Sequence, residues 1–219
     1  MKTFPNVLQP PFEEVFGKDH ALKGNWNRVH FKNDGYITLE LGCGKGEYTL
    51  GMARIFPERN FIGIDIKGAR IWRGARDALQ ENLSNVAFLR TRIDFITGFF
   101  AKDEVDEIWI TFPDPQPKKD LKKLTSSRFL NRYKQFLRQN GTINLKTDNK
   151  ELFEYTRDLA EYNQLRILTL TDNLYQSDLN NEILSIQTFY EKIWLEEGLK
   201  IHYIQFQINH DVIHEIPKK

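Results

Sequence analysis

Three glycines at alternate positions follow an apolar stretch and precede a helical one, in Glu40-Leu41-Gly42-Cys43-Gly44-Lys45-Gly46. Glycine lets the backbone turn sharply and lets a ligand approach it without meeting a Cβ atom. A dinucleotide fingerprint would place its third glycine at position 47, where this chain has Glu47. The spacing therefore indicates a ligand-binding loop of another kind, or a purely structural turn.

Two carboxylates accompany this loop. Glu40 precedes it, and Asp65 ends the next predicted strand, 23 residues after Gly42. A carboxylate at the second position can accept hydrogen bonds from both ribose hydroxyls of a nucleoside ligand. Glu40 would repel a pyrophosphate but attract a cation, and S-adenosylmethionine carries a sulfonium and an ammonium group and no phosphate. The two residues therefore favour S-adenosylmethionine over NAD as the cofactor.

Other single residues carry weaker signals. Asp94 follows the third predicted strand, where it could meet the amino group of adenine, but a surface or helix-capping aspartate also fits. Cys43 lies between two glycines with no histidine nearby, so we expect a small loop residue rather than a nucleophile. His210 and His214 have the spacing of one helix face but lack a third ligand, so no metal site is expected.

A proline-rich turn, Phe112-Pro113-Asp114-Pro115-Gln116-Pro117-Lys118-Lys119, follows the fourth predicted strand. Its three prolines fix φ and stiffen the chain. In an open α/β sheet, ligands bind outside the carboxyl ends of the strands. We therefore predict that Asp114 is a carboxylate held at the mouth of the site and take it as the candidate catalytic residue; the alternative is a structural turn.

Two further polar segments occupy comparable places. Lys146-Thr147-Asp148-Asn149 ends the fifth predicted strand, where Thr147, Asp148 or Asn149 could instead be a plain helix N-cap. Thr188-Phe189-Tyr190-Glu191 precedes the last strand, and by itself it could be only a capping box.

Strand and helix periodicities alternate along the chain and predict the elements that position these residues. The predicted strands are Tyr36–Leu41, Asn60–Ile66, Val86–Arg90, Glu107–Phe112, Thr142–Lys146, Leu165–Leu170 and Ile201–Ile208. The predicted helices are Glu47–Ile55, Gly68–Asn82, Ser126–Gln139, Lys150–Asn163 and Thr188–Glu197. Short apolar strands separated by helices predict an α/β fold with a mostly parallel, seven-stranded sheet.

The two ends of the chain differ from this pattern. In the last strand Ile204 and Phe206 alternate with glutamines, which predicts a half-exposed edge strand antiparallel to the others. Residues 1–35 contain scattered prolines and aromatics without a clear period, and we expect an arm laid over the core. We therefore predict a single domain over 1–219, with the arm at 1–35 and a Rossmann-like core at 36–219.

Composition bounds the class of protein. The 219 residues are 40% hydrophobic and 28% charged, which excludes disorder, collagen and coiled coil as descriptions of the whole chain. One cysteine cannot form an internal disulfide, no apolar run reaches the roughly 18 residues of a membrane helix, and Met1–Pro11 lacks the apolar core of a signal peptide. We expect a cytoplasmic protein with no membrane partner, present as a monomer or a homodimer.

Charge is balanced overall, at 31 basic and 30 acidic residues, but not locally. Between Gln116 and Lys134, seven basic residues face one acidic residue, a net charge of +6. A second basic set, Lys67, Arg70, Arg73 and Arg76, opens another predicted helix. Such a basic side suits a polyanionic partner; the alternative is a solvated helix surface.

The order of these motifs resembles that of a known family. Glu40-x-Gly42-x-Gly44-x-Gly46, Phe112-Pro113-Asp114-Pro115, Lys146-Thr147-Asp148 and Thr188-x-x-Glu191 together make the chain resemble the bacterial TrmB family, the tRNA (guanine-N7-)-methyltransferases. The resemblance runs from about Asn6 to the last strand. The glycine loop identifies only the cofactor class, whereas the combination of the later motifs is much more specific.

This resemblance implies a class I S-adenosylmethionine-dependent methyltransferase fold and a tRNA substrate. It implies that the glycine loop (Gly42, Gly44, Gly46), Glu40, Asp65, Asp94 and Asp114 contact S-adenosylmethionine or line its pocket. It also implies that tRNA binds to Lys118, Asp148, Thr188, Phe189, Tyr190 and Glu191, and that the target is the variable-loop guanine, guanine-46. The chain departs from the family at Gln116, where Trp is frequent, and at Asn149, where an aromatic is frequent.

The implied acceptor determines the mechanism we expect. Guanine N7 has an in-plane lone pair and no proton, so transfer needs orientation rather than a general base. Asp114 would either stabilise the charge that develops on the ring or hold the guanine N1–H and amino group. Two other functions remain open from the sequence: methylation of an exocyclic amino group, and RNA binding without catalysis.

Overall fold

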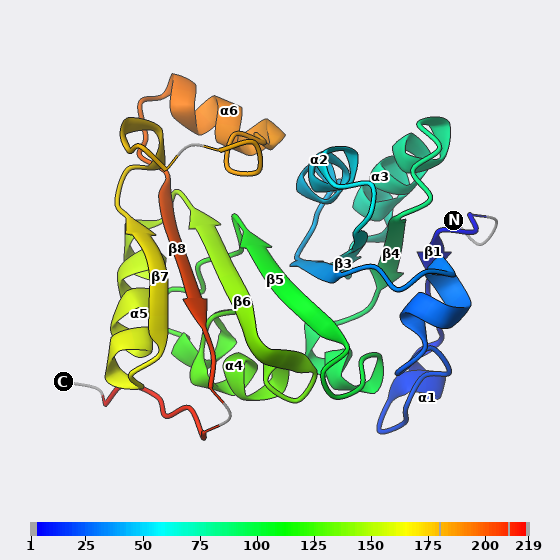
Figure 1. Ribbon diagram of the computed structural model, residues 1–219. Coiled ribbons are helices and arrows are strands. Elements are labelled where there is room, and N and C mark those ends of the chain that lie inside the picture. Colours follow the sequence, from blue (N-terminus) through cyan, green and yellow to red (C-terminus); the bar gives the residue numbers. More distant parts are fainter. Residues whose placement is uncertain (1–3, 180, 210, 218–219) are drawn as a thin grey trace.

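The computed structural model describes residues 4–179, 181–209 and 211–217. In this part of the chain, eight strands form one sheet in the order β1-β4-β3-β2-β5-β6-β8-β7 (Figure 1). The strands are β1 Val7–Leu8, β2 Ile37–Leu41, β3 Asn60–Asp65, β4 Val86–Arg90, β5 Val105–Thr111, β6 Leu137–Thr147, β7 Arg166–Thr171 and β8 His202–Gln207. β1 to β6 pair in parallel, and β8 is antiparallel to both of its neighbours.

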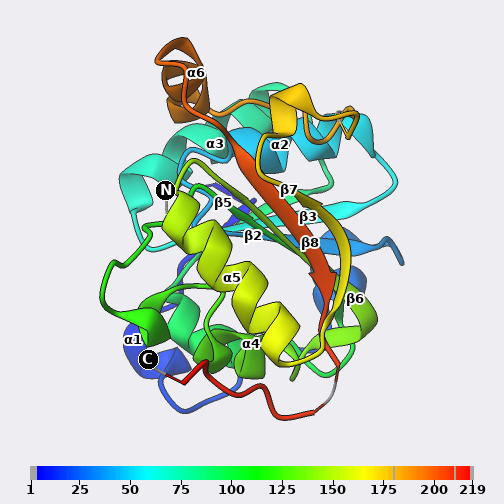
Figure 2. The ribbon, with the colours of Figure 1, turned by 90° about the vertical axis from the view of Figure 1, so that its left-hand side faces the viewer.

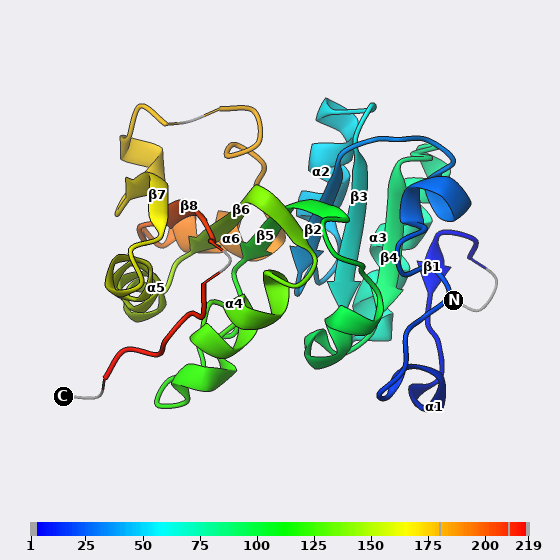
Figure 3. The same cartoon turned by 60° about the horizontal axis from the view of Figure 1, so that its bottom comes forward.

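Helices cover both faces of the sheet (Figures 2 and 3). They are α1 Phe12–Val15, α2 Glu47–Ile55, α3 Gly68–Gln80, α4 Ser127–Tyr133, α5 Lys150–Tyr162 and α6 Phe189–Glu196. Apolar residues of α4 and α5 belong to one core cluster, and those of α2 and α3 belong to a second cluster on the opposite face. No helix in the described ranges combines the length and the apolar character needed to cross a bilayer.

Alternation along β2 shows how one strand serves both cores. Ile37, Leu39 and Leu41 belong to the cluster under α4 and α5, while Glu40 lies on the opposite face of the strand. β2 pairs with β3 on one side and with β5 on the other, so the strand order reverses there. The carboxyl ends of β2 and β5 therefore flank the crevice in which open α/β sheets bind ligands.

The predicted mostly parallel sheet with an antiparallel last strand is confirmed, but the predicted edge position is wrong. β8 lies between β6 and β7, and the edge is β7, whose residues alternate between exposed and half-buried. Gln205 and Gln207 are only partly exposed, because β7 pairs with this strand on its outer side. The alternation in the sequence indicates that one face of β8 is partly exposed to solvent, but it cannot indicate whether another strand pairs with the edge of β8.

The predicted helix Ser126–Gln139 is also wrong in its second half. α4 ends at Tyr133, and β6 begins at Leu137, which pairs with Val105 of β5. Phe136 and Leu137 are both buried. Their apolar side chains continue the helical spacing of α4, although they reach the core at the start of β6. The helical periodicity in the sequence therefore runs past the true end of the helix.

The N-terminal segment contributes an eighth strand that the sequence did not predict. Val7–Leu8 pair in parallel with β4 at the edge of the sheet. Trp26 is fully buried, and its indole N–H donates to the carbonyl of Phe99 at 2.8 Å. The Glu104 carboxylate accepts hydrogen bonds from the amides of Gly24 and Trp26. These bonds hold the segment against the core, and the division of the chain at residue 35 stays a prediction.

Candidate active site

The glycine loop joins β2 to α2 at the carboxyl edge of the sheet. Gly42, Gly44 and Gly46 have φ angles of 78°, 56° and 73°, which favour glycine. A Cβ atom on Gly46 would lie 2.7 Å from the ring of Phe88, whereas one on Gly42 or Gly44 would meet no atom of the described residues within 4 Å. The space in front of Gly42 and Gly44 is therefore open to a ligand.

Glu40 is buried behind this loop. One carboxylate oxygen accepts hydrogen bonds from the amide (2.8 Å) and the hydroxyl of Thr49, and the other accepts one from the hydroxyl of Thr111 at 2.6 Å. Burial raises the pKa of Glu40 to about 7 even though these bonds favour the ionised form. A cation in the adjoining space would stabilise the carboxylate, so this position suits a positively charged ligand.

Asp65 lies at the end of β3, opposite the loop. Its two carboxylate oxygens accept hydrogen bonds from the amides of Gly44 (2.9 Å) and Lys67 (2.7 Å). These bonds hold the carboxylate in one orientation, and each oxygen keeps a lone pair for a further donor. The predicted bonds to a ribose remain a prediction, and the geometry leaves room for them.

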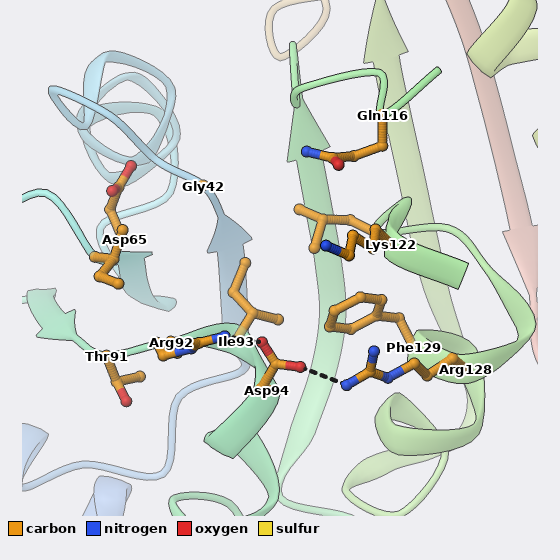
Figure 4. A pocket seen from close by; sticks show the side chains of 12 residues that line it. Gly42, Asp65, Thr91, Arg92, Ile93, Asp94, Gln116, Lys122, Arg128 and Phe129 are labelled. Atoms are coloured by element: carbon orange, nitrogen blue, oxygen red, sulfur yellow. Dashed lines mark hydrogen bonds and ion pairs between the residues drawn. The ribbon is translucent and has the colours of Figure 1, made fainter. Parts of the chain in front are cut away.

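A cavity of about 470 Å³ opens between these residues and α4 (Figure 4). This volume lies in the range of small-molecule sites. Its lining comes from the loop, from the ends of β3 and β4, and from α4: Gly42, Asp65, Ile66, Thr91, Arg92, Ile93, Asp94, Gln116, Lys122, Leu124, Arg128 and Phe129. The predicted cofactor residues Asp65 and Asp94 therefore share one cavity.

Asp94 carries a contact that the sequence did not indicate. Arg128 of α4 donates to one of its oxygens at 2.8 Å, and Arg92 lies 3.5 Å from the other (Figure 4). The alternative role as a helix cap is not seen, since no side-chain cap is present on the turn Ile93–Gly98. Asp94 is thus held by a salt bridge across the cavity, with its carboxylate on the lining.

A smaller cavity, of about 140 Å³, lies beside the first and shares Gly42 with it. Glu40 and Thr111, the glycine loop and α6 all contribute to its lining. Its lining is Glu40, Gly42, Cys43, Gly44, Lys45, Glu47, Arg70, Thr111, Phe112, Thr188, Tyr190 and Trp194. Cys43 is a buried loop residue here, and burial raises the pKa of its thiol, as expected for an unreactive cysteine.

The proline-rich turn lies between the two cavities. Phe112 lines the smaller cavity and Gln116 the larger one, and both have positive φ angles, of 48° and 49°. Such angles are uncommon for residues with side chains and are concentrated at functional sites. Asp114 is exposed between them and accepts a hydrogen bond from the amide of Gln116 at 3.1 Å. Its carboxylate lies at the mouth of the site, on the turn between these two lining residues. In the described part of the chain Asp114 itself lines neither cavity, so its contact with S-adenosylmethionine remains a prediction.

Basic side chains surround this mouth. Lys118, Lys119 and Lys122 are exposed on the turn, and Lys67 and Arg70 are exposed at the start of α3. Lys123 is an exception within the basic window, because it is buried and paired with Asp120. In the described ranges, no group of three or more His, Cys, Asp or Glu side chains is placed to bind a metal; His210 lies outside those ranges.

The Thr188–Glu191 segment is the capping box of α6, with both reciprocal hydrogen bonds present. The Glu191 side chain is fully buried and forms a salt bridge with Lys146 of β6 at 2.7 Å. Lys146 also donates to the carbonyls of Leu184 and Ile186, each at 2.9 Å. Glu191 thus anchors α6 to β6 instead of facing solvent. Its contact with tRNA remains a prediction.

The other predicted substrate residues lie near the surface. Phe189 and Tyr190 are about half exposed on α6. Asp148 is half-buried, and burial raises the pKa of its carboxyl group. Of the three residues that could cap the following helix, Asn149 is the N-cap, and its side chain accepts a hydrogen bond from the amide of Leu152 at 2.8 Å. Asp148 is therefore not used as a cap.

Sequence reasoning missed three contributors to this site. The sequence places Arg128 only in a basic window and Lys146 only at the end of a strand, and it assigns no role to Trp194. For Lys146 and Trp194 a signal existed, because a lysine inside an apolar strand requires a buried partner, and Trp194 follows Tyr190 at the i, i+4 spacing of one helix face.

Known structures share this fold. An antibiotic-related methyltransferase aligns with a TM-score of 0.64 at 17% identity, over 90% of this chain and 98% of its own. The 16S rRNA methyltransferase KamB aligns with a TM-score of 0.65 at 12% identity, over 88% and 95%. A sheet of this topology, with a glycine loop and acidic residues at its carboxyl edge, is the fold of class I S-adenosylmethionine-dependent methyltransferases.

Sequence comparison then gives the family. A family model described as "Putative methyltransferase" matches residues 34–204. The tRNA (guanine-N(7)-)-methyltransferase of Bacteroides fragilis (strain YCH46) is 52% identical over 94% of this chain and 82% of its own. That of Porphyromonas gingivalis (strain ATCC BAA-308 / W83) is 54% identical over 94% and 86%. The chain belongs to the family of tRNA (guanine-N7-)-methyltransferases, which confirms the resemblance of its motifs.

Proposed function

We propose that this chain transfers the methyl group of S-adenosylmethionine to N7 of the variable-loop guanine of tRNA, guanine-46 in tRNA numbering. The observation that carries the proposal is the buried carboxylate of Glu40 behind an open glycine loop, beside a strongly basic turn. The buried carboxylate suits a cationic cofactor, and the basic rim suits a polyanionic substrate.

The residues present fit S-adenosylmethionine. The larger cavity suits the adenosine, with the ribose hydroxyls on Asp65 and the adenine amino group on Asp94. The smaller cavity suits the amino-acid end, with Glu40 behind it and the open backbone of Gly42 and Gly44 between the two. When bound, the cofactor supplies a methyl group made electrophilic by the adjoining sulfonium.

The protein's part in the reaction is orientation. Guanine N7 presents a lone pair and no proton, so no side chain has to remove one. The residues around the mouth of the site must hold N7 in line with the methyl group and exclude water, which lowers the barrier by proximity. The stiff turn Phe112–Lys119 suits this work, because its prolines and positive φ angles leave Asp114 little freedom.

Asp114 is the residue to which we assign catalysis. Its exposed carboxylate belongs to the turn between Phe112, which lines the smaller cavity, and Gln116, which lines the larger one, and we expect the acceptor base to enter there. Methylation leaves a positive charge on the imidazole ring of guanine, and a fixed carboxylate nearby stabilises such a charge as it develops. The same carboxylate can accept hydrogen bonds from the guanine N1–H and amino group. Both roles require the charge and position of Asp114.

We assign the tRNA contacts to the rim. Lys118 and its neighbouring lysines would meet phosphates, and Asp148, Thr188, Phe189 and Tyr190 would surround the entering nucleotide. Glu191 would act through the position of α6. A protein that acts on tRNA would meet its substrate in the cytoplasm. One copy of the chain contains every residue assigned here, so a monomer and a homodimer are both compatible with the reaction.

The test is methyl transfer onto an unmodified tRNA transcript, followed by digestion and nucleoside mass spectrometry. We expect N7-methylguanosine from a transcript with guanine at position 46 and none from the same transcript with adenine there. Methylation of an exocyclic amino group would assign the chain to another reaction. Saturable cofactor binding without any transfer would leave it an RNA-binding protein.

A further inference from the structure

Three aromatic side chains from two elements form one wall of the smaller cavity. Tyr190 and Trp194 lie one turn apart on α6, with ring centroids 5.9 Å apart and planes 27° from parallel. Phe112, directly after β5, packs on Trp194 at 5.1 Å. All three rings line the cavity, and Tyr190 is about half exposed. The wall therefore runs from solvent to the residue that precedes Pro113 and Asp114.

The wall is held in place by contacts that do not involve its own rings. The buried Lys146–Glu191 salt bridge ties the first turn of α6 to β6, and the hydroxyl of Tyr175 donates to Glu191 at 2.8 Å. On the other side, the amide of Phe189 donates to the carboxylate of Glu47 in α2 at 3.2 Å. α6 is thus attached to both halves of the sheet, and the rings are positioned before any ligand binds.

The proline-rich turn and the loop after β6 each have a polar residue, Gln116 and Asn149, at a position where an aromatic residue could stack on a base. Gln116, on the proline-rich turn, carries an amide and lines the other cavity. The side chain of Asn149, after β6, is occupied as the cap of α5. A flat base that enters beside Asp114 therefore finds its aromatic partners on α6 and at Phe112.

We propose that Tyr190 and Trp194, backed by Phe112, stack on the target guanine during methyl transfer. This inference rests on the proposed function and deepens it. Every base has a π face, so stacking on an aromatic side chain holds a base without reading its edge. The wall is suited to this reaction in a second way: aromatic faces attract cations, and N7 methylation makes the guanine ring cationic. The wall stabilises the charge as it forms, and the carboxylate of Asp114 acts on the same ring.

The experiment compares Tyr190→Leu and Trp194→Leu with Tyr190→Phe and Trp194→Phe, in assays of tRNA methylation and of cofactor binding by calorimetry. We expect each leucine variant to lower kcat/KM for tRNA by about 10-fold or more, the scale of one lost base–aromatic stack. The phenylalanine variants should retain most of the activity. Because both rings line the cavity assigned to the amino-acid end of the cofactor, the Kd for S-adenosylmethionine can rise in the leucine variants, but by less than kcat/KM for tRNA falls. Tyr162→Leu, at an equally exposed tyrosine on α5, is the matched control and should behave as wild type.

A second measurement separates stacking from simple support of the fold. Loss of the rings should weaken binding of the N7-methylated transcript by about 2- to 5-fold more than binding of the unmethylated one, because only the former is cationic. Leucine variants with wild-type kinetics would overturn the stacking proposal, as would a loss of cofactor affinity equal to the loss of activity. If the wild-type protein forms no N7-methylguanosine in this assay, the proposed function itself fails.

Discussion

At the scale of single residues, the four carboxylates of the site lie in four different environments. Glu40 is buried among hydroxyl donors, Asp65 is fixed by two backbone amides, and Asp94 is held by an arginine. Asp114 alone of these four is exposed at the mouth. We propose that the four environments serve four different tasks: attraction of a cation, recognition of a ribose, recognition of adenine and stabilisation of a charge in the transition state.

Asp114→Asn tests the last task. The amide keeps the shape of the side chain and removes its charge, so we expect methyl transfer to slow by about 10²- to 10³-fold, the range for removing one electrostatic stabiliser. Because N7 carries no proton, no titrating base should disappear from the pH profile. Single-turnover rates at saturating tRNA and cofactor measure the effect. Asp178→Asn, at an exposed aspartate outside both cavities, is the control, and a rate within 2-fold of wild type would contradict the assignment of Asp114.

Glu40 predicts a pH dependence. Burial raises its pKa from about 4.5 to about 7, so between these values the folded protein holds a proton that the unfolded chain releases. Its contribution to the free energy of unfolding therefore falls as pH rises from 4.5 through 7, by up to about 3 kcal/mol. Glu40→Gln removes this term. Urea unfolding of the cofactor-free proteins at pH 5 and pH 8 should favour the variant more at pH 8, and parallel pH profiles would contradict the raised pKa.

The same variant tests the ligand. If Glu40 faces the cationic end of the cofactor, binding should favour the ionised carboxylate and release protons near pH 7. Calorimetry in two buffers of different ionisation enthalpy measures that release. We expect it in wild type and expect it to disappear in Glu40→Gln, together with weaker binding by roughly 1.5–3 kcal/mol, the scale of a lost interaction with a charged group. Equal proton release from both proteins would remove Glu40 from the site.

At the scale of elements, α6 depends on a buried ion pair. A buried charge that loses its partner typically costs about 3–5 kcal/mol, whereas exposed pairs contribute about 1 kcal/mol or less. Lys146 and Glu191 have no exposed side-chain surface, and Lys146 has three acceptors for its three protons. The pair therefore specifies where α6 and its aromatic face lie.

Lys146→Met should lower the free energy of unfolding by about 3–5 kcal/mol, because Glu191 is left buried and unpaired. Lys146→Met with Glu191→Gln should recover part of this loss, since the second change removes the stranded charge and keeps the capping box. Lys150→Met is the control: its pair with Glu154 is largely exposed, and we expect a change below about 0.5 kcal/mol. Equal losses in the single and double variants would show that the charge of Glu191 is not the cause.

At the scale of the whole molecule, a nearly neutral protein presents a basic rim at one edge of its sheet. The net charge is only +1, but Lys67, Arg70, Lys118, Lys119 and Lys122 are exposed around the carboxyl ends of the strands. Lys32 and Lys102, which precede β2 and β5, lie at the opposite edge. Such a distribution orients a polyanion toward the cavities.

The salt dependence of tRNA binding tests this arrangement. Each lost phosphate contact should reduce the slope of log K against log salt by roughly 0.7–0.9. We expect Lys118→Gln with Lys119→Gln to reduce the slope by about twice that amount. Lys32→Gln with Lys102→Gln removes the same charge from the far edge and should leave the slope unchanged. Equal slopes in wild type and the first variant would show that the lysines of the turn are only a solvated surface.

Local chemistry in the sequence was enough for seven of the eight strands in the described part of the chain and for the list of acidic residues at the carboxyl edge of the sheet. Glycine spacing, proline positions and alternating hydrophobicity depend on residues that are close in the chain, so they can be recognised before the fold is known. This is why the loop at Gly42, the turn at Asp114 and the capping box at Thr188 lie where their motifs indicated. The same reasoning failed at β1 and at the start of β6, where a partner strand, rather than the local period, decides the element.

What only the tertiary structure decided is which side chains meet across long separations. Arg128 pairs with Asp94 from another element, Lys146 pairs with Glu191 across 45 residues, and Phe112 packs on Trp194. In each of these contacts, the residues that are close in the chain do not indicate which distant residue is the partner. The sequence by itself determined the reaction class and the acidic residues that we propose serve it. The tertiary structure decided how those carboxylates are held and which rings stand beside them, because burial and pairing depend on distance in space rather than on distance along the chain.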